Sequence, residues 1–211
     1  EFARGQEGDL WKGEVADPAF PEDVIGRTEN LYWRPSWVNR KYFIEEEDYP
    51  QAQAFAAALE FLETNRDEDN WLLQLEVFDP HEPYLAPEKY RQLYPHKYSG
   101  PHFKWPTYQP ANQPEEQIEH IRYEHAALLS MCDAHLGKML DYMDREDLWE
   151  DTLLIVCTDH GFLLGEHGWI AKNLPPCYQE IAHTPLFVWD PRSRKRGVRQ
   201  GNLVQTIDLP P

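Results

Sequence analysis

The sequence predicts an α/β fold, in which helices cover the faces of a sheet. Two short runs of apolar and branched residues, Trp71–Phe78 (WLLQLEVF) and Leu153–Cys157 (LLIVC), indicate strands. Each follows a longer segment, residues 50–62 or 114–145, whose apolar residues recur at steps of three and four, as on one face of a helix. Strands that alternate with helices are typical of layered α/β domains.

Length and composition limit the class of protein. The 211 residues suffice for one domain with a hydrophobic core. The net charge of −17, from 37 acidic and 20 basic residues, argues against nucleic acid as a partner, because phosphate backbones call for a basic face. No stretch approaches the roughly 20 apolar residues that cross a bilayer, so we expect no membrane span. Three widely spaced cysteines, an odd number, indicate neither a disulfide framework nor a zinc ribbon.

The first 49 residues are rich in proline, acidic residues and aromatic rings, with one short candidate strand at Val24–Thr28. Their rings are suited either to a platform for a sugar or to anchoring an irregular segment on the core, and we favour the anchoring role. The helical pattern begins at Pro50, and an acidic stretch, residues 66–70, ends it.

The strand at Trp71–Phe78 leads into a proline-rich turn, Asp79-Pro80-His81-Glu82-Pro83-Tyr84. Prolines on either side of His81 stiffen this turn and hold the imidazole in place. A histidine near neutrality can donate to an ester oxygen and help to protonate a leaving group. The alternative is an exposed turn histidine. Residues 84–114 then form a long irregular excursion, which we expect to border a binding crevice.

The helix predicted from Pro114 to about Arg145 carries three histidines. His120 and His125 are five residues apart, so they diverge by roughly 140° around a helix at about 100° per residue. No H-E-x-x-H pair exists, and we assign His120, His125 and His135 to packing or solvent rather than to zinc.

The strand Leu153–Cys157 has five consecutive apolar residues, a pattern typical of strands buried on both faces in a parallel sheet, and we expect Cys157 to be buried. Thr158, Asp159, His160 and Gly161 follow at its carboxyl end, where open α/β sheets place their ligands. A carboxylate and a neutral imidazole are good ligands for a divalent cation, and glycine permits a sharp turn beside it. An ordinary turn is the alternative.

Two segments resemble signature regions of the sulfatases, members of the alkaline-phosphatase superfamily. TDHGFLLGEHGWIAK (158–172), a turn centred on Tyr178 and then Thr184-Pro185-Leu186 resemble the family's second signature, and Pro80-His81-Glu82-Pro83 its Pro-His-x-Pro turn. The resemblance implies an alkaline-phosphatase-like mixed sheet sandwiched by helices. It also implies that residues 50–211 are the central part of that domain and residues 1–49 an irregular segment of it.

By this resemblance, Asp159 and His160 are ligands of a divalent metal, most simply Ca²⁺, with Mn²⁺ and Mg²⁺ as alternatives. Lys172 and His81 contact the sulfate group, and His81 also serves the leaving oxygen. The implied substrate is a small anionic ester such as a sulfated carbohydrate. Many sulfatases carry asparagine at the position of His160, and histidine occurs among relatives that hydrolyse phosphonate and phosphate esters, so the choice of ester stays open.

The sulfatase nucleophile is a formylglycine made from Cys or Ser in a Cys/Ser-x-Pro-x-Arg motif, and Pro-x-Arg follows none of the cysteines Cys132, Cys157 and Cys177. We therefore expect this chain to be the middle segment of a sulfuric-ester hydrolase and to be inactive alone. The alternatives are a phosphonate or phosphodiester hydrolase on the same scaffold, and a non-catalytic scaffold domain. The sequence indicates no compartment.

Overall fold

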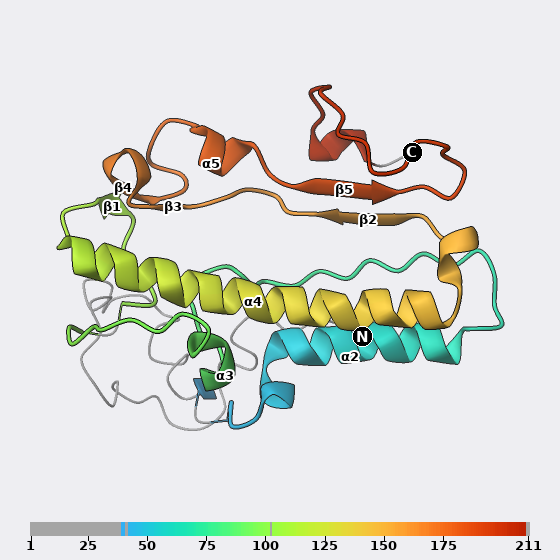
Figure 1. Cartoon of the computed structure of the whole chain (residues 1–211), viewed down its shortest axis with the longest axis horizontal. Coiled ribbons are helices and arrows are strands. Elements are labelled where there is room, and N and C mark those ends of the chain that lie inside the picture. Colours follow the sequence, from blue (N-terminus) through green and yellow to red (C-terminus); the bar gives the residue numbers. More distant parts are fainter. Residues whose placement is uncertain (1–38, 41, 102, 210–211) are drawn as a thin grey trace.

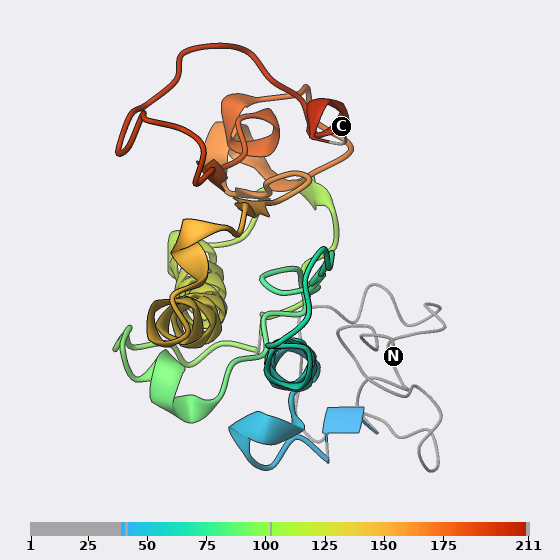
Figure 2. The ribbon, with the colours of Figure 1, turned by 90° about the vertical axis from the view of Figure 1, so that its right-hand side faces the viewer.

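The computed structural model describes residues 39–40, 42–101 and 103–209, so the strand expected at Val24–Thr28 lies outside the described residues. Two helices, α2 (Pro50–Thr64) and α4 (Glu115–Arg145), pack side by side. The strands β2 (Leu154–Cys157) and β5 (Leu186–Trp189) lie above α4 (Figure 1). Figure 2 looks along the helices and shows them as one layer with the strands as another.

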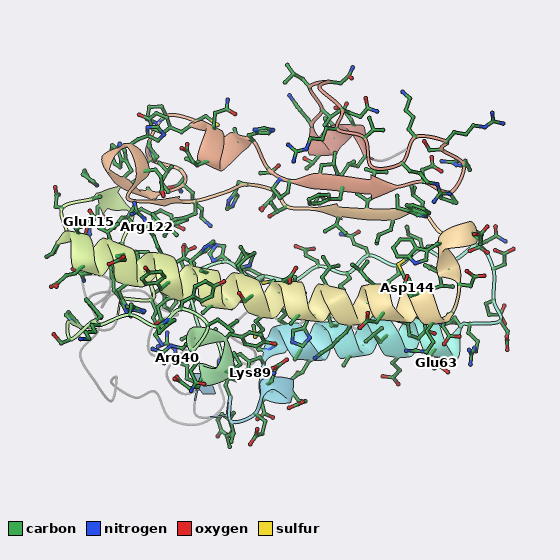
Figure 3. All side chains as sticks on the ribbon, in the orientation of Figure 1. Arg40, Glu63, Lys89, Glu115, Arg122 and Asp144 are labelled. Carbon is green, nitrogen blue, oxygen red and sulfur yellow. The ribbon has the colours of Figure 1, made fainter. Side chains whose placement is uncertain are left out.

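Both long helices begin where the sequence predicts. Pro50 occupies the first turn of α2, and α4 starts directly after Pro114, where a missing backbone N–H costs no hydrogen bond. Glu115 and Glu116 place acidic groups in the first turn of α4, as the helix dipole favours. Figure 3 shows Glu115 and Arg122 at this end of α4, and the Arg122 guanidinium donates at 2.8 Å to the carbonyl of Leu164 in the strand layer.

The described strands form two small antiparallel sheets. One pairs β2 with β5, with Leu154 opposite Trp189 and Cys157 opposite Leu186. The other has the order β1 (Gln109–Pro110), β4 (Trp169–Ala171), β3 (Leu163–Leu164). Five short helices complete the described elements: η2 (Glu46–Asp48), α3 (Glu88–Arg91), η3 (Leu148–Glu150), α5 (Gln179–Ala182) and η5 (Thr206–Asp208), besides the turn η4 (Glu166–Gly168).

The structure corrects the expected burial of β2. Its side chains alternate between half-buried and exposed, and Cys157 is exposed. Its one described neighbour is β5 and runs antiparallel, so the expected parallel pairing is also wrong for the described residues. A run of apolar residues shows that both faces of a strand are suited to burial. Whether both faces are buried depends on a layer of other elements covering each of them.

The strand expected at Trp71–Phe78 is a second correction. This segment forms no ladder with the described residues, although its side chains alternate between half-buried and exposed as a strand's do. The half-buried set, Trp71, Leu73, Leu75 and Val77, packs against a cluster formed by α2 and α4. The alternating pattern therefore predicted correctly which side chains pack, but not the backbone pairing.

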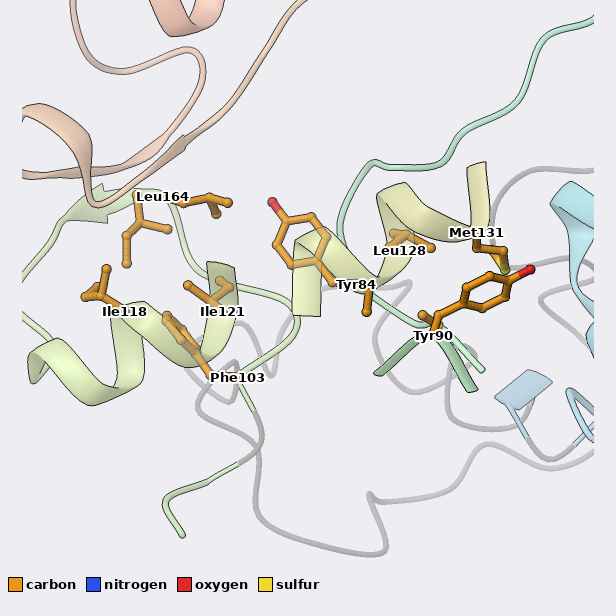
Figure 4. Close-up of a cluster of buried hydrophobic side chains, with 11 residues drawn as sticks. Tyr84, Tyr90, Phe103, Ile118, Ile121, Leu128, Met131 and Leu164 are labelled. Atoms are coloured by element: carbon orange, nitrogen blue, oxygen red, sulfur yellow. The ribbon is translucent and has the colours of Figure 1, made fainter. Parts of the chain in front are cut away.

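The main hydrophobic cluster fixes the turn that carries His81 (Figure 4). Tyr84, 1% exposed, lies directly after this turn and packs among side chains of α4, with Ile121 and Leu128 fully buried. The backbone N–H of Tyr84 donates at 2.8 Å to the carbonyl of Lys104, which joins the two ends of the loop between them. The Pro-His-x-Pro turn is thus attached to the most tightly packed part of the described chain.

Candidate active site

His81 and Lys172 meet in the structure, although 91 residues separate them in the sequence. The Nζ atom of Lys172 lies 2.5 Å from the Nε2 atom of His81. Lys172 directly follows β4, whose Ile170 and Ala171 are fully buried, so a packed strand fixes where its side chain starts. The Lys172 side chain is 14% exposed and that of His81 31% exposed, which leaves the pair accessible at the surface of the packed core.

The hydrogen bonds of His81 determine which ring nitrogen carries the proton. Its Nδ1 atom lies 2.6 Å from the backbone carbonyl oxygen of Glu82. A carbonyl oxygen only accepts, so Nδ1 is the donor. In the neutral ring, Nε2 then has a lone pair, and it accepts from the ammonium of Lys172. The ammonium, and Nε2 when it carries a proton, are suited to donate to the oxygens of one anionic group.

Asp159 and His160 form a second polar pair, after the carboxyl end of β2. The Nε2 atom of His160 lies 3.5 Å from a carboxylate oxygen of Asp159, and its Nδ1 lies 3.0 Å from the carbonyl oxygen of Gly161. By the same reasoning Nδ1–H donates to that carbonyl and Nε2 keeps its lone pair, which is the arrangement of a histidine that ligates a metal. The Asp159 side chain is 81% exposed.

The carboxyl of Asp159 is held in its charged form. Desolvation raises its pKa, but the hydrogen bond from the backbone N–H of His160, at 2.8 Å, the electrostatic interaction with the neighbouring imidazole and the hydrogen bond from the Thr158 hydroxyl together lower it by more. The pKa of Asp159 therefore lies below its ordinary value. An ionised carboxylate and an imidazole lone pair are two donors of the kind that divalent cations bind.

Gly161 is required by a close backbone approach. A Cβ atom at this position would lie 1.8 Å from the carbonyl oxygen of Glu180 in α5. The backbone N–H of Gly161 donates at 2.8 Å to the carbonyl of Ile181, so the turn after β2 is bonded directly to α5. His167 secures the same helix, since its Nε2 lies 3.1 Å from both carboxylate oxygens of Glu180 and its ring stacks on Tyr178.

The described residues fit part of a metal site. Asp159 and His160 offer the right donor atoms, but within residues 39–40, 42–101 and 103–209 no group of three or more His, Cys, Asp or Glu side chains could hold an ion. Hard cations such as Ca²⁺ take six to eight oxygen ligands. A cation bound here would therefore need ligands beyond these two side chains.

Two residues at the His81–Lys172 pair were missed by the sequence analysis. The Glu82 carboxylate is buried beside both side chains, and Tyr108 donates a short hydrogen bond to it. Tyr108 belongs to the excursion at residues 84–114, so this loop does border the pair. Glu82 was visible within the Pro-His-x-Pro turn, but nothing in the sequence indicated that its side chain is buried. Tyr108 carried no signal of its own.

Comparison with known proteins defines the class. Residues 11–211 match the family model of the sulfatases, and the chain belongs to the sulfatase family. It is 28% identical to the choline-sulfatase of Rhizobium meliloti over 68% of this chain and 32% of that protein. It is 22% identical to an arylsulfatase of Clostridium perfringens (82% and 39%), and 26% identical to the multifunctional alkaline phosphatase superfamily protein PehA of Trinickia caryophylli (73% and 35%).

The fold agrees with this assignment. The crystal structure of yidJ from Bacteroides fragilis, a protein classed with the sulfatases, superimposes with a TM-score of 0.55 at 17% identity, over 68% of this chain and 31% of that one. The alkaline-phosphatase-like fold predicted from the sequence is thus confirmed. The chain spans about a third of the length of the relatives it matches. None of the helices in the described part of the chain is long and apolar enough to cross a membrane.

Proposed function

We propose that this chain is the central segment of a sulfuric-ester hydrolase and that His81 and Lys172 bind the sulfate group of its substrate. The observation that carries the proposal is the 2.5 Å approach of Lys172 Nζ to His81 Nε2. The match to the sulfatase family, and to relatives named choline-sulfatase and arylsulfatase, supports the reaction class. A relative named N-acetylglucosamine-6-O-sulfatase, from Bacteroides thetaiotaomicron, supports a sulfated sugar as one substrate class.

Each side chain of the pair has a distinct part in this reaction. The Lys172 ammonium neutralises charge on the sulfate oxygens, which grows as the ester bond breaks. In this step Nε2 of His81 takes up a proton from solvent, in place of its hydrogen bond from Lys172, and donates it to the leaving oxygen, which returns the ring to the neutral form with hydrogen on Nδ1. The bond from Nδ1 to the Glu82 carbonyl holds the ring in position through both states.

Asp159 and His160 would hold the metal in this proposal, with Ca²⁺ preferred and Mn²⁺ or Mg²⁺ as alternatives. The ion would act as a Lewis acid toward the ester. The remaining ligands and the nucleophile, a formylglycine, would come from parts of the enzyme other than residues 39–209. The hydrogen bond from the backbone N–H of Gly161 to Ile181 would help to hold Asp159 and His160 in place, because it joins their turn to α5.

The reaction class is tested by turnover in the full-length protein that contains this chain. We expect an aryl sulfate to be hydrolysed with a higher kcat/KM than the matched aryl phosphodiester and aryl phosphonate. Replacement of Lys172 by alanine should lower kcat/KM by about 10²-fold or more, as for loss of one oxyanion contact. The matched control is Lys195→Ala, an exposed lysine, which should leave the rate unchanged. Absence of sulfate-ester turnover, or a preference for the phosphorus esters, would overturn the proposal.

The second candidate, a phosphonate or phosphodiester hydrolase, is favoured by His160 and by the resemblance to a protein described as multifunctional. Comparing turnover of the same aryl sulfate, phosphodiester and phosphonate distinguishes this candidate from a sulfatase. Loss of activity on all three would favour the scaffold alternative.

The metal ligands are tested by calorimetric titration with Ca²⁺ and Mn²⁺. We expect heat of binding in the wild-type protein, its loss in Asp159→Ala, and no change in Asp67→Ala, an exposed aspartate. Equal heats in wild type and Asp159→Ala would remove Asp159 from the site. The same assay on residues 1–211 alone, together with an aryl sulfate, should show weak metal binding and no turnover.

A further inference from the structure

The least expected feature of the site is a buried carboxylate beside its two candidate catalytic groups. The Glu82 side chain is 2% exposed. One of its oxygens lies 3.3 Å from His81 Nδ1 and 4.0 Å from Lys172 Nζ. A carboxylate removed from water is costly unless charges and hydrogen bonds compensate for its lost hydration. Here the Lys172 ammonium and the Nδ1–H of His81 lie beside the carboxylate, so two groups of the candidate site compensate for its lost hydration.

Tyr108 completes the contacts of this carboxylate. Its hydroxyl donates a short hydrogen bond to the other oxygen of Glu82, and its ring lies 5.9 Å from Lys172 Nζ. The pairing of β1 with β4 explains why Tyr108 lies beside Lys172. Tyr108 precedes β1, in which Gln109 is paired with Ile170 of β4, and Lys172 follows β4. The antiparallel register therefore brings residue 108 to the end of β4 from which Lys172 extends.

The contacts of Glu82 act on the orientation of the His81 ring. The backbone carbonyl of Glu82, 2.6 Å from Nδ1, accepts the Nδ1 hydrogen and so leaves Nε2 facing Lys172. The Glu82 carboxylate, 3.3 Å from the same nitrogen, places a negative charge beside this N–H. The carboxylate attracts the Lys172 ammonium as well, so one side chain fixes the relative position of both nitrogens.

We propose that Glu82, held by Tyr108, is the positioning residue of the ester site. Its carboxylate holds the His81 ring at Nδ1 and the Lys172 ammonium beside Nε2, and so directs Nε2 and the ammonium at the same anionic group. It does not touch the ester itself. The role rests on the proposed function, because the group that it positions is the sulfate-binding pair. The competing explanation is that Glu82 only stabilises the folded turn.

The test uses Glu82→Gln, which keeps the size of the side chain but replaces one acceptor oxygen by an N–H₂ donor. Its readout in the full-length protein is kcat for aryl sulfates whose leaving groups range from good to poor. Because His81 protonates the leaving oxygen, we expect kcat to fall about 10-fold to 10²-fold for poor leaving groups and far less for good ones. Loss of fold stability alone would lower kcat by the same factor for every substrate. Glu116→Gln, an exposed glutamate in the first turn of α4, is the matched control.

The second readout does not need activity. The ¹⁵N shifts of the His81 ring, assigned with His81→Gln, report which nitrogen carries hydrogen. We expect Nδ1–H in both proteins, because the backbone carbonyl of Glu82 remains, and a changed Nε2 shift in Glu82→Gln, because the Lys172 ammonium is no longer held beside Nε2. If the wild type hydrolyses no sulfate ester but the Nε2 shift changes in Glu82→Gln, the proposed reaction fails while the positioning role stands. If both the Nε2 shift and the leaving-group dependence match the wild type, the positioning role is refuted.

Tyr108→Phe keeps the proposal testable should Glu82→Gln fail to fold. It removes the hydroxyl that donates to Glu82 and keeps the ring beside Lys172. A loss of a few-fold in kcat, again concentrated on poor leaving groups, supports the proposal. Unchanged kcat for every ester contradicts it.

Discussion

The buried histidine His120 should make the stability of the protein depend on pH. It lies on α4 at 4% exposure, with its Nδ1 2.7 Å from His96 Nε2 and its ring stacked on Tyr98. Burial lowers the pKa of His120 to about 4, against the attraction of the Glu124 carboxylate, and the neighbouring charges of His96, Lys104 and Arg91 lower it further. The folded protein thus resists protonation of this ring.

The size of the effect follows from the two pKa values. The pKa of His120 is about 4 in the folded state and 6.5 in the unfolded chain, so the unfolded chain binds the proton first as the pH falls. The contribution of the neutral ring is complete above pH 6.5 and is lost as the pH falls toward 4. At about 1.36 kcal/mol per pKa unit, the protein loses about 2–3 kcal/mol between roughly pH 7.5 and 4.5 from this group.

Urea titrations of wild type and His120→Gln at these two pH values measure this loss as a free energy of unfolding. The variant has no group to protonate at this position, so its decrease in stability should be smaller than that of the wild type by about 2–3 kcal/mol. His183→Gln, which replaces an exposed histidine, should show the wild-type decrease. The reasoning is refuted if His120→Gln loses as much stability on acidification as the wild type does.

Two further predictions concern packing and the cysteines. Gly161→Ala should destabilise the turn after β2 by about 1–3 kcal/mol and weaken Ca²⁺ binding, because the new Cβ would lie 1.8 Å from a carbonyl of α5. Gly137→Ala, inside α4 with nothing within 4 Å of the new Cβ, should instead stabilise the protein by about 0.5–1 kcal/mol. Thermal melts compare the stability of the two variants, and calorimetry compares their Ca²⁺ binding. Equal effects of the two substitutions would contradict the geometry. Burial raises the pKa of the Cys132 thiol to about 12, so a thiol reagent at neutral pH should modify the exposed Cys157 and Cys177 and spare Cys132, which peptide mass spectrometry can check.

The helices could be predicted from the sequence because their signals are local. The spacing of apolar residues and the prolines at Pro50 and Pro114 determine where α2 and α4 begin, and the structure agrees. The burial of β2 could not be predicted in the same way. Its apolar run is a local property, whereas its cover depends on which elements lie over each face, and Cys157 is exposed for that reason.

The same distinction between local and long-range signals applies to the candidate site. The motifs contained His81 and Lys172, and the structure brings the two side chains together. Glu82 and Tyr108 had no such signal, because an acidic residue in a proline turn usually lies in solvent and burial here depends on β4 and its neighbour β1. A strand of two residues such as β1 leaves no periodic pattern in the sequence. The supporting contacts of a site are therefore harder to predict than the residues in its motifs.

The most direct test of the account is a double-mutant cycle on the sulfate-binding pair. It compares kcat/KM for one aryl sulfate in the full-length wild type, His81→Ala, Lys172→Ala and the double variant. If the two side chains act on the same group, each single replacement should lower kcat/KM by about 10²-fold or more, and the double loss should be clearly smaller than the product of the single losses. Wild-type kcat/KM in either single variant, or single losses that multiply fully, would contradict the account.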